Sequence, residues 1–412
     1  MSSPLPVPAA RRASRSLPLL AGLLLTDLLL APLPALAQAS SQLGDQAEPQ
    51  QAALEAGGYK LIGQLETELN LDLNGRRGGR RGYSDLFNKT ELGLYLSLPG
   101  GFAVNSVFKL EPADRPVDGS DRAFHAHAAW IDQLYLSWAQ GPLQLFAGKI
   151  HPRFGMAWDE APGLYGDDFA QGYELSEKIG GGVNLSLSDL LGATDRVGQH
   201  SVQLEFFQAD RTGLSSSLFA RRWSYQDGQG RLRYSARNRR AYGGPDNTEG
   251  VGNWVASLAG QEVPLPLGEL SYTLGYSSRR AGLDSLQAGT AATERGSVAG
   301  LAWEVPLPWQ LTATPLVEWV RQENADGLRG LRRQVLTSGA ELARGPVSLA
   351  YVYEWMKESG TDRAQAAMHT ASASYELPWV DGLVWTVGWR RLREEGQAAN
   401  DYGTQLSYSF RF

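Results

Sequence analysis

Carboxylates gather in one segment of the chain, between residues 151 and 174. Five acids there accompany a single base, Arg153, which gives the segment a net charge of −4. Acidic groups on one side of a water-filled passage and basic groups on the other create a transverse field that orients and selects passing solutes. The pattern therefore favours electrostatic selection of solutes rather than the making of bonds. The residues expected to form such a constriction are Lys149, Arg153, Asp159, Glu160, Asp167 and Asp168.

The same segment carries four aromatic residues, Trp158, Tyr165, Phe169 and Tyr173. An exposed, mobile loop seldom needs so many large side chains, so they indicate packing against other parts of the protein. The segment is also too rich in Gly and Pro to continue as a strand. The sequence predicts an inserted loop at about 150–174, with a solvated surface loop as the alternative.

The elements around this loop alternate with a period of two residues. Clear examples are residues 61–71, 92–98, 270–276 and 347–355. Such a period excludes helices for these segments. A soluble β-sandwich would alternate as well. However, Leu, Tyr and Trp occupy one face while the other is small and polar, which is typical of strands between lipid and a watery lumen.

Sixteen candidate strands can be counted, and an even number places both termini on the same side of a membrane barrel. Fourteen or eighteen strands remain possible. Short connections alternate with longer polar ones, as in outer-membrane barrels. The predicted fold is an all-β, transmembrane, antiparallel up-and-down barrel over residues 58–412, wide enough to leave an aqueous channel. The strands are expected to start near residues 59, 87, 102, 127, 143, 175, 200, 250, 269, 296, 310, 332, 346, 366, 383 and 401.

Both ends of the chain carry export features. Three arginines, an apolar stretch over residues 17–30 and the small residues 35–37 predict a signal peptide at 1–37 for the Sec pathway. The Arg11-Arg12 pair leaves twin-arginine export as an alternative. Residues 38–57 are read as a short periplasmic segment. The last strand ends at Phe412, which resembles the signal that directs Gram-negative barrels to the barrel-assembly machinery.

Charged residues outside the acidic segment are expected on the inner wall and at the outer rim. The predicted wall residues are Glu66, Glu68, Lys109 and Arg390. Guanidinium groups at the rim could bind lipopolysaccharide phosphates or attract anionic solutes, or could simply be solvated. The predicted rim cluster consists of Arg76, Arg77, Arg80, Arg81, Arg237, Arg239 and Arg240.

Several function classes are disfavoured. Removing three Arg and one Asp with the signal peptide takes the net charge from −6 to −8, which argues against nucleic acid as a partner. His125 and His127 lack a further ligand at metal spacing, so neither metal nor cofactor is expected. His200 and Ser201 are adjacent on a strand and point to opposite faces, so they cannot form a catalytic pair. No enzyme is predicted.

A short motif resembles a known family. Gly148-Lys149, Pro152 and Phe154-Gly155 are similar to the strand-to-loop motif of the phosphate-selective porins of the O and P family. The resemblance implies a sixteen-stranded trimeric channel with inward Arg and Lys, whereas Lys109 is the one clear inward base in the N-terminal third here. We expect a passive outer-membrane channel for small hydrophilic solutes or ions in the lipid bilayer. The alternatives are a non-conducting structural or adhesive barrel and an outer-membrane hydrolase.

Overall fold

The computed structural model describes residues 54–56, 58–76, 81–113, 120–220, 237–360 and 364–412. The predicted signal peptide and most of the predicted periplasmic segment lie outside the described residues, as do Arg77 and Arg80 of the predicted rim cluster. Among the described residues, no helix is long and apolar enough to cross a membrane.

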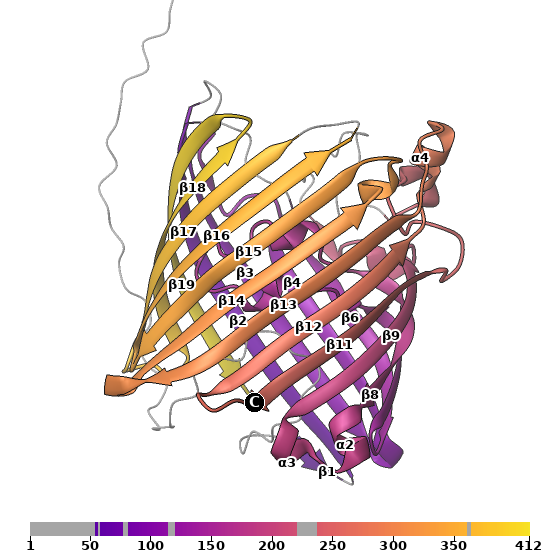
Figure 1. The fold of residues 1–412 in the computed structure, drawn as a ribbon, viewed down its shortest axis with the longest axis horizontal. Coiled ribbons are helices and arrows are strands. Elements are labelled where there is room, and N and C mark those ends of the chain that lie inside the picture. Colours follow the sequence, from indigo (N-terminus) through magenta and orange to yellow (C-terminus); the bar gives the residue numbers. More distant parts are fainter. Residues whose placement is uncertain (1–53, 57, 77–80, 114–119, 221–236, 361–363) are drawn as a thin grey trace, which may run out of the picture. The chain divides into compact units, whose positions relative to one another are not determined.

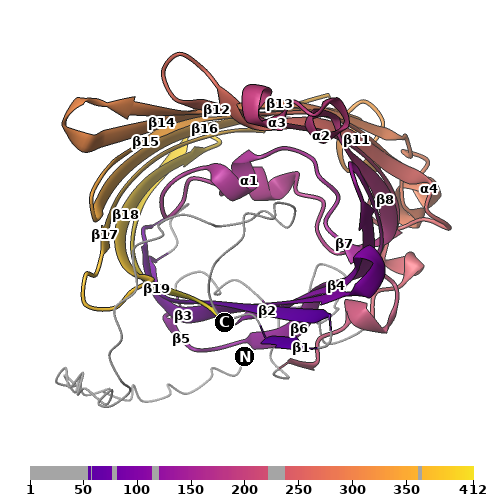
Figure 2. The same cartoon turned by 90° about the horizontal axis from the view of Figure 1, so that it is seen from below.

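Sixteen long antiparallel strands form a closed barrel (Figure 1; Figure 2). Each strand pairs with the next along the chain, and β19 pairs with β2 to close the wall. The predicted fold class and strand number are confirmed. The barrel strands are β2 (Tyr59–Asn74), β3 (Tyr83–Leu98), β4 (Phe102–Pro112), β6 (His127–Gln140), β7 (Leu143–Ile150), β8 (Lys178–Ser186), β9 (Gln199–Ala209), β11 (Asn253–Pro264), β12 (Glu269–Arg279), β13 (Glu294–Leu307), β14 (Leu311–Glu323), β15 (Arg332–Arg344), β16 (Val347–Ser359), β17 (Gln365–Glu376), β18 (Leu383–Glu394) and β19 (Gln397–Arg411).

Short strands and helices lie beside the long strands of the barrel. Three short strands extend the sheet: β1 (Leu54–Ala56) pairs with β2, β5 (Arg122–Ala123) with β3, and β10 (Phe219–Ala220) with β6. Helices are confined to connections between strands. They are α1 (Ala157–Glu160), α2 (Leu187–Leu191), α3 (Thr194–Val197) and α4 (Leu283–Gln287), with 3-10 turns at Pro99–Gly101, Ala170–Gly172, Gly213–Ser215, Arg240–Tyr242, Pro308–Gln310 and Ala325–Gly327.

The two ends of the barrel differ in their connections. One end, called here the turn end, has tight turns such as residues 141–142 and 345–346, and β2 starts and β19 finishes there. The other, called the loop end, has longer connections such as 151–177, 210–252 and 280–293. The connection 187–198 is the longest at the turn end because it holds α2 and α3. This asymmetry matches the alternation of short and long connections in the sequence.

Strand β16 shows how alternation sorts the side chains. Leu349 and Tyr351 are 53% and 50% exposed on the outer face, whereas Val352 and Glu354 on the opposite face are fully buried. Apolar groups therefore cover the outside of this wall. A row of exposed apolar side chains is costly in water and favourable against lipid.

The C-terminus seals the seam of the barrel. Phe412 exchanges two backbone hydrogen bonds with Gly63 of β2, at 2.6 and 2.9 Å. The Phe412 ring stacks on Phe410, with 5.9 Å between ring centres. A Cβ on Gly63 would lie 2.2 Å from the Phe412 ring, so the ring could not keep this position beside any larger residue.

Candidate functional site

Residues 151–177, called here the inserted loop, connect β7 to β8 but run inside the barrel. Figure 2 shows α1, which belongs to this loop, within the ring of strands. The ring centres of Phe154 and Tyr173 lie 6.4 Å apart, and the ring planes are nearly perpendicular, at 83°. These rings, with Met156, pack on inward side chains of β9, β11, β13, β14 and β15. The loop therefore lies against one half of the wall through a dry, apolar contact.

Three buried carboxylates of that wall hold the backbone of the inserted loop. Each is at most 1% exposed and accepts hydrogen bonds from loop N–H groups. A buried acidic side chain is costly unless hydrogen-bond donors satisfy it, so these contacts with the loop backbone stabilise both partners. The three contacts are Arg153 N to Glu205 Oε2 at 2.8 Å, Met156 N to Glu318 Oε2 at 2.6 Å, and Phe169 N to Glu354 Oε1 at 3.0 Å.

Glu318 has the fullest set of donors. It also accepts from Ala157 N at 3.2 Å and from the Tyr173 hydroxyl. None of these three acids was among the predicted site residues. A glutamate on the inner face of a strand looks in the sequence like any channel-lining acid. The only local signal is its position opposite the exposed apolar residues of the same strand.

The far side of the inserted loop is tied to the opposite wall by a cluster around Arg390 of β18. Arg390 forms ion pairs with Asp168 of the loop and, at 2.7 Å, with Asp401 of β19. Its guanidinium also lies over the Tyr165 ring, 4.5 Å from the centre. The Tyr165 hydroxyl donates to Asp72 of β2 at 2.7 Å. The loop thus spans the lumen and is fastened on both sides.

A polar cavity of about 300 Å³ lies between the inserted loop and this wall. Its lining contains five carboxylates and two cations, so its charge is negative overall. Such a cavity can hold hydrated solutes and favours cations. The residues that line it are Glu68, Asn70, Asp72, Phe87, Lys89, Trp158, Asp159, Ala161, Gly163, Leu164, Tyr165, Asp167, Asp168, Gln171, Arg390 and Gln405.

Asp167 titrates differently from an exposed aspartate. Its burial raises the pKa of the carboxyl, and the neighbouring Asp168 adds to that effect. A hydrogen bond from Gln171 Nε2 at 2.7 Å acts in the opposite direction. The charge of Asp167 is therefore lost at a higher pH than that of a solvated aspartate.

Of the predicted site residues, the structure brings five together around the cavity: Glu68, Asp159, Asp167, Asp168 and Arg390. The others lie elsewhere. Arg153 and Glu160 belong to the inserted loop but do not line the cavity. Glu66 is nearer the turn end, where the Gln64 side chain donates to it at 2.7 Å.

Lys149 does not belong to the constriction, which corrects the prediction. It shares a strand face with Leu145, which is 44% exposed, and so points away from the lumen. Its ammonium group is fully buried and donates to the carbonyl oxygens of Ile131 at 2.6 Å and Leu214 at 3.0 Å. It also lies 3.5 Å from an oxygen of Asp210. Lys149 therefore fastens the 210–252 connection to the wall.

Lys109 belongs to a second charged cluster, at the base of the inserted loop. Its ammonium group lies 3.1 Å from Asp132 and 3.4 Å from Glu91. His151, the first residue of the loop, places its two ring nitrogens 3.3 Å from Asp132 and 3.7 Å from Glu174. Asp132 was not predicted, because an extra residue in the pairing of β4 with β6 alters the alternation just there.

The remaining predicted features bear on metal binding, catalysis and the rim. Among the residues that the structure describes, no group of three or more His, Cys, Asp or Glu is placed to hold a metal ion. Both ring nitrogens of His200 are engaged, with Tyr272 Oη at 2.8 Å and Val197 O at 2.9 Å. Arg237, Arg239 and Arg240 line a pocket at the loop end, which is described below.

Comparisons with known proteins identify the fold. No protein-family model and no curated protein matches the sequence. Solved structures do: OprB of Pseudomonas putida (12% identity, 86% of this chain and 94% of that chain covered, TM-score 0.56) and OmpF of Salmonella typhi in complex with daunomycin (12%, 87% and 100%, 0.55). The outer membrane channel DcaP of Acinetobacter baumannii is also similar (11%, 87% and 100%, 0.52). At such identity the likeness establishes the fold of outer-membrane porins.

Proposed function

We propose that this porin-type barrel is an outer-membrane channel through which small hydrophilic solutes or ions diffuse passively. One observation carries the proposal: the inserted loop is fastened across the lumen and leaves a charged cavity of about 300 Å³ beside one wall. A barrel filled only for stability would need neither the polar lining nor the charges. The fold shared with OprB, OmpF and DcaP supports the same conclusion.

The inserted loop would act as the constriction. Its apolar side faces β9 to β15, so solutes would pass on its other side, along β18, β19, β2 and β3. There Asp159 and Asp167 of the loop lie in one cavity with Lys89 of β3. Charges of opposite sign across a narrow passage orient solutes, and the excess of carboxylates gives a preference for cations.

The outer surface supports a location in a bilayer. Trp309 and Trp379 lie in turns at the turn end and are 79% and 70% exposed. Exposed tryptophans beside an apolar band are typical of the interface between lipid and water. We place the turn end in the periplasm and the loop end outside the cell. Sec export, recognition of Phe412 by the assembly machinery, contact with lipopolysaccharide and a homotrimeric state belong to the same proposal.

We further propose that the protein is not an enzyme. A hydrolase would need a nucleophile within hydrogen-bonding distance of its base. The ring nitrogens of His200 meet a tyrosine hydroxyl and a backbone carbonyl instead. The charged groups that line the cavity suit selection of solutes by charge.

Planar bilayer recordings test this proposal. Refolded protein should produce ohmic conductance steps, and its reversal potential in a salt gradient should have the sign of cation preference. Folding is checked independently by the shift in gel mobility on heating. Protein that is folded by this criterion but gives no conductance would contradict the channel and support a sealed, structural or adhesive barrel.

A further inference from the structure

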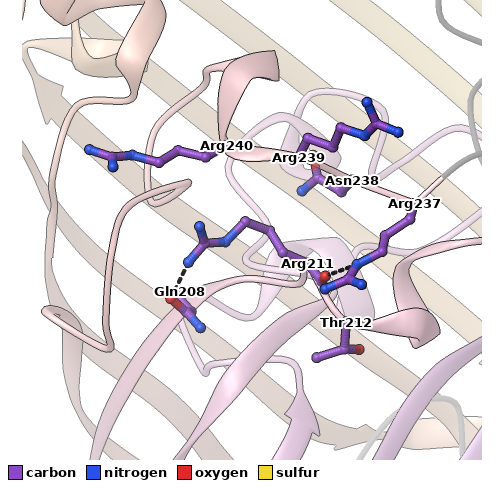
Figure 3. Close-up of a pocket in the computed structure, with 7 residues that line it drawn as sticks. All are labelled: Gln208, Arg211, Thr212, Arg237, Asn238, Arg239 and Arg240. Carbon is purple, nitrogen blue, oxygen red and sulfur yellow. Dashed lines mark hydrogen bonds between the residues drawn. The ribbon is translucent and has the colours of Figure 1, made fainter.

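A second pocket lies at the loop end, beside the end of β9, and its volume is about 530 Å³ (Figure 3). Four arginines line it and, among the described residues, no carboxylate does. A pocket of one sign concentrates ligands of the other. The complete lining is Gln208, Arg211, Thr212, Arg237, Asn238, Arg239 and Arg240.

Neutral partners hold the two central arginines. Arg211 donates from Nη2 to Gln208 Oε1 and to Thr248 O, each at 2.8 Å. The Arg211 Nε is buried and, within the described chain, has no hydrogen-bond partner. Arg237 donates to the backbone oxygen of Arg211 (Figure 3). These contacts position both guanidinium groups without neutralising their charge.

The outer two arginines add to this charge. Arg240 pairs with Glu249, but the two side chains are 40% and 75% exposed, so the pair is weak. Among the described residues, the guanidinium group of Arg239 has no hydrogen bond or ion pair. In the part of the chain that the structure describes, Arg240 is therefore the lining arginine that forms an ion pair with an acid. The excess of positive charge in the lining points to an anionic ligand.

The position of the pocket narrows the choice of ligand. Gln208 shares a strand face with Phe206 and Val202, which are 45% and 40% exposed. Phe207, on the opposite face, packs against the inserted loop. The pocket thus opens above the apolar outer face of the barrel. If the barrel lies in the outer membrane as proposed, this is the height at which lipid headgroups meet the protein.

We propose that the pocket binds a phosphorylated saccharide through Arg211, Arg237 and Arg239. Guanidinium groups match phosphate oxygens with two parallel hydrogen bonds. A single phosphate ion would leave most of the volume empty, whereas the volume suits a small organic ligand. Figure 3 shows the guanidinium groups spread around the pocket, which fits a ligand with several polar groups. Its source is either a glycolipid headgroup or a free sugar phosphate.

Binding to the full chain in detergent tests the proposal. The probes are lipopolysaccharide, its enzymatically dephosphorylated form, and glucose 6-phosphate. The test variant is Arg237→Gln/Arg239→Gln, and Arg239→Gln alone serves as a variant that disturbs no contact among the described residues. The matched control is Arg295→Gln/Arg329→Gln, which removes two exposed charges elsewhere at the loop end.

We expect the native protein to bind lipopolysaccharide about tenfold more tightly than its dephosphorylated form, and the test variant to lose about tenfold in affinity while the control keeps it. Arginine-dependent binding of glucose 6-phosphate would identify a free solute as the source, and its absence a lipid headgroup. Equal binding of both glycolipids, or unchanged binding by the test variant, would contradict the proposal that this pocket binds a phosphorylated saccharide. Conductance is recorded on the same samples, so loss of the channel and loss of the pocket are separate results.

Discussion

Asp168 in the inserted loop and Arg390 on β18 form an ion pair although 222 residues separate them in the chain. Arg390 also holds Asp401, which is fully buried. One guanidinium group therefore fastens the inserted loop to the wall and compensates two carboxylates.

Replacing Arg390 should loosen the loop. Arg390→Gln removes the ion pairs to the buried Asp401 and to Asp168, and removing one partner of a buried pair costs about 3 kcal/mol. We expect a lower unfolding temperature, noisier conductance and stronger cation preference. Thermal unfolding and single-channel recordings measure these effects. Behaviour like that of the native protein would mean that the pair contributes nothing to holding the loop.

Asp167 should contribute to charge selection. Asp167→Asn removes one negative charge from the cavity, and a screened unit charge changes the free energy of a nearby ion by less than about 1 kcal/mol. We therefore expect the ratio of cation to anion permeability to fall by about twofold. Reversal potentials in a salt gradient measure it. Asp381→Asn, in a turn at the turn end, is the control and should leave the ratio unchanged.

The selectivity should depend on pH through the same residue. Because burial raises the pKa of Asp167, its carboxylate is present above that pKa and is lost as the pH falls through it. An ordinary aspartate has a pKa of about 4. Cation preference should therefore begin to decline, as the pH is lowered, at a pH higher than that. Reversal potentials across pH in the native protein and in Asp167→Asn check this. Two superimposable curves would remove Asp167 from the titration.

Glu318 should hold the first turn of the inserted loop. In Glu318→Gln an amide replaces the carboxylate that accepts from Met156 N, Ala157 N and the Tyr173 hydroxyl. Weaker acceptance by a neutral group should cost about 1–3 kcal/mol locally. We expect faster proteolysis of residues 151–177 in an otherwise folded barrel. Glu269→Gln, an exposed strand residue at the turn end, is the control; equal proteolysis of both variants would contradict the role.

Closure of the barrel should be sensitive to a single methyl group. In Gly63→Ala the new Cβ would lie 2.2 Å from the Phe412 ring, so the terminal residue must move. We expect a lower temperature for the loss of the compact band on gels. At Gly213 an added Cβ meets nothing within 4 Å, so Gly213→Ala is the matched control. Equal melting of the two variants would show that Phe412 does not stabilise the seam.

Local sequence patterns specify the strands of the barrel wall. A period of two residues assigns Leu349 and Tyr351 to one face and Glu354 to the other, because successive side chains of a strand point in opposite directions. The same rule places Lys149 with Leu145 on the outer face, because they are an even number of positions apart. A positive charge on an outward position is unusual, and Lys149 has one because the 210–252 connection covers it. Strand number and closure by the last strand also follow from local patterns.

Which charged groups meet, in contrast, depends on the three-dimensional fold. Asp168 and Arg390 both read as lumen residues, yet their pairing depends on the path of a loop across the barrel. Glu205, Glu318 and Glu354 hold backbone N–H groups 52, 162 and 185 residues away. Every residue has a backbone N–H, so no side-chain pattern identifies such a partner. A repeating local pattern in the sequence therefore predicts the fold, whereas the site arises from single contacts between distant parts of the chain.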